Sequence, residues 1–321
     1  MSANMPFHVN PELTGIALAY RNTGYIADEI LPRVPVSQKS FQYKKYDNSA
    51  FLNIPNSEIG RKGLPETMEL KSELLSESCV DHSVMAEVPE DDVLEANAAS
   101  GTEKEDPIGD NTLLATEGLK LAREKRVADL ITNSATYDGN VVTLSGSDRF
   151  TDKTSSFLDT YYEVIEKMIM EPNYAVVSSI GARYLQRHPD FLSIYKSDNA
   201  DNKGQVPLDF IAKELGLEKI LVGKSKANAQ KPGKTPVIQT LWGVDLALFY
   251  LNPIARPKYG LTFGLTATKG STEVQTYFEG KFGAHGVHYI KPVETLKELI
   301  MAPACGFLIK NAFDNTPATK N

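Results

Sequence analysis

Two extended runs, separated by a segment rich in turn-forming residues, constrain this chain more than any other feature. Aromatic side chains alternate at Phe41 and Tyr43 in the first run, and the second covers about residues 67–88. Residues 48–65, between them, are rich in proline, glycine and asparagine. A two-stranded hairpin of this kind has no hydrophobic partner of its own and is marginal in water. We therefore expect a long hairpin whose tip packs on a neighbouring molecule.

The segment before the hairpin, residues 1–40, predicts an arm that lies on another surface. Residues 10–20 are a candidate for a short amphipathic helix, and prolines keep residues 30–36 extended.

Composition predicts a globular chain and excludes several classes of protein. The chain has 321 residues, 41% of them apolar, with 34 Lys and Arg against 41 Asp and Glu, a net charge of −7. That charge argues against a sequence-reading DNA binder, which needs clustered Lys and Arg. The N-terminus has no signal-peptide pattern, and no apolar run approaches the length of a bilayer span. Cys79 and Cys305 are too few for a disulfide framework and are expected to be reduced.

A long helix is predicted over residues 110–136, with Leu114, Leu121 and Ala128 seven apart along one stripe. At about 1.5 Å per residue such a helix is roughly 40 Å long and can act as a beam across a domain. It carries a charged turn, for which we expect solvated or interface ion pairs rather than nucleic-acid contacts. The charged residues are Lys120, Arg123, Lys125 and Arg126, beside Glu117, Glu124 and Asp129.

The rest of the chain predicts an α/β unit followed by strands. Residues 155–222 alternate helix and strand, residues 224–235 are polar with four lysines and predict a surface loop, and the last third is mostly strand.

Motifs that would carry chemistry are incomplete. Residues 233–235 resemble the end of a phosphate-binding loop, but Asn228 stands where that loop needs glycine. The pair His285 and His288 lacks a third metal ligand nearby, and the acidic run 90–92 fits the start of a helix. We expect no catalytic residue, no cofactor and no metal, and the chain is not expected to be an enzyme.

Three segments carry a family resemblance. They are residues 27–36 (ADEILPRVPV), residues 83–92 (SVMAEVPEDD), and residues 172–177 (PNYAVV) with the later pairs 184–185 and 188–189. In these segments and in the order of its elements, the chain resembles the major capsid proteins of tailed bacteriophages, which share the Hong Kong 97-type capsid fold. The resemblance spans about residues 10–310.

The resemblance implies an α+β fold with an N-arm, an extended E-loop, a spine helix in a P-domain, and an α/β A-domain. Mapped onto this chain, the N-arm is 1–40, the E-loop 41–80 and the P-domain 81–171 with its spine helix at 110–136. The A-domain is 172–285, and residues 286–321 return to the P-domain and form a tail.

The resemblance further implies a structural protein of the virion that self-assembles through hexamers and pentamers into an icosahedral shell enclosing double-stranded DNA. The shell would mature from a procapsid assembled in the host cytoplasm, with a separate scaffolding protein and a portal, and without a membrane. The expected inter-subunit residues are Phe51, Ile54, Ile59, Arg61, Lys62 and Leu64 at the E-loop tip, and Leu13, Ile16 and Tyr20 in the N-arm. Lys62 is also the candidate for a covalent Lys–Asn cross-link of the kind that some relatives form.

Three alternatives stay open at this stage. They are an encapsulin-like shell that encloses proteins, a soluble α/β enzyme without a recognisable motif, and a tail or decoration protein of the same virion.

Overall fold

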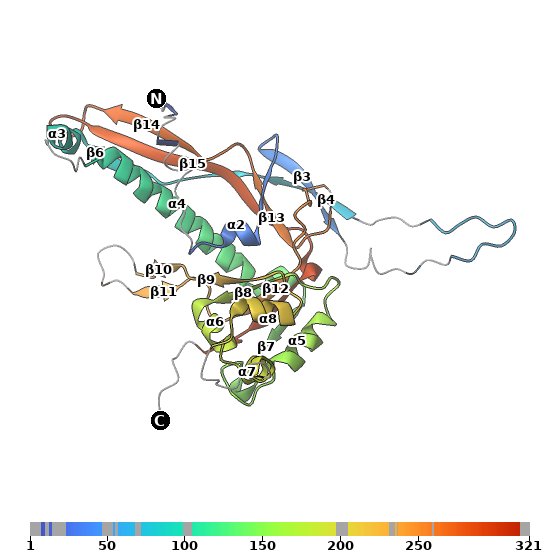
Figure 1. Cartoon of the computed structure of the whole chain (residues 1–321). Coiled ribbons are helices and arrows are strands. Elements are labelled where there is room, and N and C mark those ends of the chain that lie inside the picture. Colours follow the sequence, from blue (N-terminus) through green and yellow to red (C-terminus); the bar gives the residue numbers. More distant parts are fainter. Residues whose placement is uncertain are drawn as a thin grey trace.

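The computed structural model describes residues 8–9, 13–14, 24–46, 54, 57–67, 72–98, 105–196, 205–230, 235, 237–258 and 260–314. Two sheets, a long helix and a projecting hairpin make up most of the regular structure (Figure 1). Helices and mostly antiparallel strands are combined in the chain, which confirms the predicted α+β class.

The larger sheet has seven strands and is built around one long strand, β15 (Val287–Ile300). β15 pairs antiparallel with β13, β14, β5 and β6, while β2 pairs in parallel with β13, and β1 pairs with β14. The described parts of the N-terminal arm therefore join this sheet at two places. The strand bounds are β1 His8–Val9, β2 Arg33–Pro35, β5 Val80–Ser83, β6 Ala86–Pro89, β13 Gly264–Thr268 and β14 Glu273–Glu279.

The long helix α4 (Pro107–Ile131) packs along β15 and β6, beside the short helix α3 (Glu90–Ala98). Pro107 suits the first turn of a helix, and the side chain of Asp106 caps it by accepting from the backbone N–H of Gly109 at 3.0 Å. The 25 residues span about 38 Å. The predicted long helix is confirmed, although it begins three residues earlier and ends five residues earlier than predicted, followed by the 3-10 turn η2 (Ser134–Tyr137).

The buried face of α4 differs from the predicted stripe. Leu114 is 67% exposed, whereas Leu119, Arg123 and Val127 are all buried. These three residues are four apart, so they share one helix face. Of the predicted stripe, Ala128 is buried, Leu121 is half-buried and Leu114 is exposed. The prediction followed residues seven apart, whereas the core face of α4 also includes a charged residue.

The second sheet has five strands in the order β7-β16-β12-β8-β9 and is buried on both faces. Along β12, Leu246 and Leu248 face the core formed with α5–α8, while Ala247 and Phe249 face α4. The sheet therefore lies between these helices and α4. The bounds are β7 Val141–Thr143, β8 Tyr174–Ser178, β9 Lys219–Gly223, β12 Leu246–Phe249 and β16 Gly306–Lys310, with α5 Phe157–Ile165, α6 Ser179–Leu185, α7 Pro189–Lys196, α8 Leu208–Glu214, η3 Gly146–Asp148 and η4 Pro303–Cys305.

The two sheets divide the chain differently from the expected domain boundaries. β13 and β14 fall in the range 172–285, yet they pair in the seven-stranded sheet. β7 and β16 fall in ranges expected to join the P-domain, yet they pair in the five-stranded sheet beside β8 and β12. The chain crosses between sheets more often than a linear division allows, because its strand partners lie far apart in sequence.

Two hairpins extend from these sheets. β3 (Ser40–Tyr46) pairs antiparallel with β4 (Ser72–Ser78), as the sequence predicts, and residues 57–67 between them project away from the rest of the chain (Figure 1). The base of this hairpin does have a core, because Tyr43 is buried against the cluster that includes Cys79 and Leu265. The second hairpin, β10 (Lys226–Asn228) with β11 (Ile238–Thr240), lies where a surface loop is predicted, so strands replace part of that loop.

Candidate functional site: assembly surfaces and a buried polar clasp

The described tip of the β3–β4 hairpin presents apolar side chains to solvent. Ile54 is 96% exposed, Leu64 94% and Ile59 54%, and Arg61 and Lys62 are also exposed. Phe51, the sixth residue expected at this surface, lies outside the described residues. Three large apolar side chains on one projecting loop therefore have no core of their own among the described residues.

The N-terminal arm places its one described candidate differently. Leu13 is buried against Val88, Val274 and Ile290 of its own chain, and the hydroxyl of Thr14 accepts from the backbone N–H of Val274 at 3.0 Å. An inter-subunit role for Leu13 does not fit this position, because its side chain is already covered. Ile16 and Tyr20 lie outside the described residues.

A buried carboxylate on α4 holds the N-terminus of α2 (Ala27–Ile30), a short helix in the last part of the arm. Glu124 is fully buried, and its oxygens accept from the backbone N–H of Ala27 at 2.9 Å and of Ile26 at 3.1 Å. The indole Nε1–H of Trp242 donates to it at 2.8 Å and the hydroxyl of Ser225 at 3.3 Å. One carboxylate thus joins the spine helix, the arm and the region of the β10–β11 hairpin.

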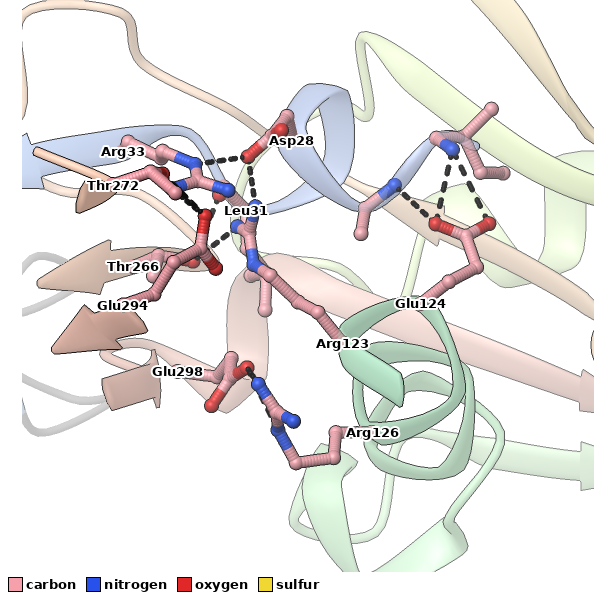
Figure 2. Close-up of polar contacts among 12 residues, drawn as sticks. Asp28, Leu31, Arg33, Arg123, Glu124, Arg126, Thr266, Thr272, Glu294 and Glu298 are labelled. Atoms are coloured by element: carbon pink, nitrogen blue, oxygen red, sulfur yellow. Dashed lines mark hydrogen bonds and ion pairs between the residues drawn. The ribbon is translucent and has the colours of Figure 1, made fainter. Parts of the chain in front are cut away.

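The neighbouring residue, Arg123, holds α2 at a second point (Figure 2). Its guanidinium pairs with Asp28 and donates to the hydroxyl of Thr266 at 3.1 Å. That hydroxyl in turn donates to the carbonyl of Leu31 at 2.9 Å. We call Arg123 and Glu124, with the residues 26–28 that they bind, the α2 clasp.

Further ion pairs tie the clasp to β15 (Figure 2). Arg33 Nη1 lies 3.0 Å from Glu294 Oε1, which also accepts from the hydroxyl of Thr272 at 2.7 Å. Arg126 Nη2 lies 3.0 Å from Glu298 Oε1. Contacts from strand β15 and helix α4 therefore hold the last part of the arm, residues 26–33.

These contacts correct the expectation of solvated or interface ion pairs on the charged turn of α4. The pair between Lys125 and Asp129 is exposed as expected, with an N–O distance of 2.6 Å. Arg123 and Glu124, however, are buried and paired within the chain. Their partners lie about 95 to 143 residues away in sequence, so no local pattern indicates them.

The two carboxylates of the clasp have pKa values shifted in opposite directions. Burial raises the pKa of Glu124, and the hydrogen bonds that it accepts offset this only in part. Burial alone would also raise the pKa of Asp28, but the guanidinium groups of Arg123 and Arg33 outweigh it and hold that pKa below its ordinary value.

Close packing fixes the indole that completes the clasp. A Cβ at Gly223 would lie 2.0 Å from Cδ1 of Trp242, which no real contact permits. Glycine at this position therefore lets β9 approach the indole, and Trp242 is itself 2% exposed.

The other sequence candidates lie apart from the clasp. Nε2 of His288 contacts the carboxylate of Glu90, and Nε2 of His285 lies 3.6 Å from Asp91 Oδ1. The acidic start of α3 thus faces the two histidines, a pairing the sequence did not indicate. Among the described residues no group of three His, Cys, Asp or Glu side chains lies close enough to hold a metal ion.

Both thiols are buried and unpaired. Burial raises the pKa of Cys305 to about 12 and raises that of Cys79 as well, so neither thiol is activated. Of the glycine-lysine-threonine run, residues 233 and 234 lie outside the described part of the chain. Across that described part, no helix is long and apolar enough to span a membrane.

Comparison with known proteins identifies the family to which the chain is similar. No protein-family model matches the chain. The major capsid protein of Pseudomonas phage JBD67 is 36% identical to it over 97% of this chain and 99% of that protein. A phage-related protein from Bordetella bronchiseptica has a similar structure, with a TM-score of 0.72 and 22% identity over 95% of this chain and 98% of that one. A subunit of the mature capsid of bacteriophage PhiM1 shares the fold, with a TM-score of 0.54 and 12% identity over 93% and 90% of the two chains.

Identity of this extent over nearly the full length of both proteins decides between the readings that the sequence left open. The comparisons support a phage capsid protein, and they support the alternatives less. The predicted resemblance is confirmed: the chain belongs to the family of phage major capsid proteins and is a shell-forming component of a virion.

Proposed function

We propose that this capsid protein forms, through hexamers and pentamers, an icosahedral shell around packaged double-stranded DNA. Its 36% identity to a phage major capsid protein carries the proposal. Assembly in the host cytoplasm with a separate scaffolding protein and a portal belongs to the same proposal. A net charge of −7 per chain fits a container that does not trap its DNA.

The sheets suggest how the domains correspond. We assign α4 and the seven-stranded sheet to the P-domain, and the five-stranded sheet with α5–α8 to the A-domain. The β3–β4 hairpin with residues 57–67 is the E-loop, and the segment before residue 37 is the N-arm, which the α2 clasp anchors to its own spine helix.

The E-loop tip needs an apolar surface on a neighbouring subunit, and α4 offers one. Val84 is 37% exposed, Met85 50% and Leu114 67%. Val84 packs over Gly118, which is one helical turn after Leu114 and so on the same face of α4. We call Val84, Met85 and Leu114 the spine patch and propose that it receives Ile54, Ile59 and Leu64 of the next copy.

Cysteine cross-linking between two kinds of copy tests this contact. We expect chains carrying Leu64→Cys, mixed with chains carrying Leu114→Cys, to form a disulfide-linked dimer on a non-reducing gel. Because both native thiols are buried, they give little background. The matched control pairs Leu64→Cys with Ile254→Cys, which is 69% exposed but outside the spine patch. Equal cross-linking in both mixtures, or none in either, contradicts the proposed contact.

A further inference from the structure

The lysine-rich hairpin β10–β11 touches the clasp only through Ser225 at its base, and its exposed face has no role in the clasp or the E-loop. The stretch 219–244 contains lysines but no aspartate or glutamate. Lys224 and Lys226 are exposed, and Ile238 is 69% exposed. Asn228 lies opposite Ile238, so Lys226, Asn228 and Ile238 project from one face of the hairpin. We call Lys224, Lys226 and Ile238 the basic face.

Side-chain hydrogen bonds hold this hairpin at its base and near its described end. Ser225 is buried and donates to Glu124, the buried carboxylate of the clasp. Near the other end of the described hairpin, Asn228 Oδ1 accepts from the backbone N–H of Val237 at 3.0 Å. The basic face is therefore held at a fixed position relative to the spine helix, as an interface requires.

Helix α5 presents the opposite charge. Asp159, Tyr162, Glu163 and the C-cap residue Glu166 are exposed and follow helical spacing, so they form one stripe. Glu163 also pairs with the exposed Lys167 on the same surface, with an N–O distance of 2.6 Å. Tyr162 is 56% exposed, whereas the opposite face of the helix is buried and its Tyr161 hydroxyl donates to the carbonyl of Leu215 at 2.7 Å. We call these four residues the acidic face.

Hairpin β10–β11, which carries the basic face, lies to the left of the five-stranded sheet in Figure 1, and helix α5, which carries the acidic face, lies to the right. The projecting residues 57–67 lie on the same side as α5. When a surface on one side of a subunit complements a surface on its other side, successive copies join head to tail. Such a series of copies closes into a ring when the rotation between neighbours allows it. The neighbour that receives the E-loop would therefore also bring its basic face to α5.

We propose that the basic face of one copy packs on the acidic face of the next copy in each ring of subunits. Ile238 meets Tyr162 as the apolar centre, and Lys224 and Lys226 surround it opposite Glu163 and Glu166. Exposed ion pairs alone contribute little, so the apolar centre supplies affinity and the charges fix orientation. The proposal rests on the proposed function, because it names the contact that holds a capsomer together.

Nucleic acid is the other partner that exposed lysines could bind. It is disfavoured because an exposed isoleucine lies on the same face of the hairpin, and a DNA backbone contact uses phosphate neutralisation rather than apolar burial.

Charge reversal in two kinds of copy tests the contact. The first variant carries Lys224→Glu with Lys226→Glu, and the second carries Glu163→Lys with Glu166→Lys. Each alone places like charges across every ring contact, and we expect at least a tenfold loss of rings and shells by sedimentation velocity. In a mixture, alternating copies restore opposite charges at every contact, so six-membered rings should return, whereas five-membered rings cannot alternate.

Circular dichroism and the emission of Trp242 confirm that each variant is folded. The proposal is overturned if either variant assembles like the wild type, or if both fail and the mixture fails too. Loss of nuclease-protected DNA with normal shells in the first variant would assign the lysines to nucleic acid instead. A wild-type chain that never associates contradicts the proposed function itself, and the head-to-tail contact with it.

Discussion

The α2 clasp gives a prediction whose size follows from the structure. Glu124→Gln keeps the shape of the side chain but replaces one acceptor oxygen with an NH2 group. The backbone N–H groups of Ile26 and Ala27, the Trp242 indole and the Ser225 hydroxyl then share one acceptor. Leaving a buried donor unsatisfied costs about 1–3 kcal/mol. The charge that burial disfavours is also removed, so we expect a net loss of about 2–3 kcal/mol, out of a total stability of about 5–15 kcal/mol for folded domains.

The sole tryptophan of the chain makes this loss directly measurable. Trp242 is 2% exposed and donates to Glu124, so its emission reports the clasp itself during urea denaturation of unassembled protein. The matched control is Lys125→Gln on the same helix, which breaks only the exposed pair with Asp129 and should cost under about 0.5 kcal/mol. If Glu124→Gln costs no more than this control, the carboxylate does not hold the clasp and the reasoning is refuted.

The stability difference between the wild type and Glu124→Gln should depend on pH, and the raised pKa of Glu124 fixes the direction. Because the folded chain raises the pKa of Glu124, the folded state binds a proton more readily than the unfolded state does. The wild type should gain stability relative to Glu124→Gln as the pH falls through the raised pKa. The gain should end at about pH 4.3, the ordinary pKa of glutamate. A wild-type advantage that shrinks over this range contradicts the direction of the shift.

Three further outcomes follow from the described contacts. Replacing residues 57–65 with a short Gly-Ser turn should leave a cooperative melt and native circular dichroism but abolish large particles, since loop closure changes by under about 1 kcal/mol; misfolding, or normal shells, would argue against the E-loop assignment. Gly223→Ala should lower the denaturation midpoint and red-shift the emission of Trp242, because the added methyl overlaps the indole; an unchanged spectrum would show that the packing relaxes. Asp28→Asn should destabilise the chain at pH 6, with the difference disappearing as the pH falls through the lowered pKa of Asp28, since that stabilising charge is lost there; a pH-independent difference would contradict the role of Arg123.

Local sequence predicts elements here much better than it predicts their partners. The alternation of helix and strand predicted over residues 155–222 is found, because an apolar run bounded by turn residues, such as β8, is a local signal. Helix α8 ends just before Gly216, whose φ of +69° is a backbone conformation that glycine favours, so this helix end is also a local signal. β15 is missed as a single 14-residue strand, because Pro292 and charged residues interrupt its apolar alternation.

In the candidate site, too, the features set by local sequence could be predicted and those set by distant partners could not. The exposure of the apolar side chains between β3 and β4 could be predicted, because a turn-rich segment between two strands leaves them without a core. The clasp could not, since the burial of Arg123 and Glu124 depends on partners that only the fold brings near. The one local signal of the buried face of α4 was the four-residue spacing of Leu119, Arg123 and Val127. This signal can be used only if an arginine is allowed in the core-facing stripe of the helix.

A cryo-electron microscopy reconstruction of particles from cells that express this chain with its scaffolding protein tests the central claim most directly. The account predicts closed shells built from rings of subunits, with residues 57–67 of each copy lying over α4 of a neighbour. Particles in which that loop folds back on its own chain, or a protein that stays monomeric under these conditions, would contradict it.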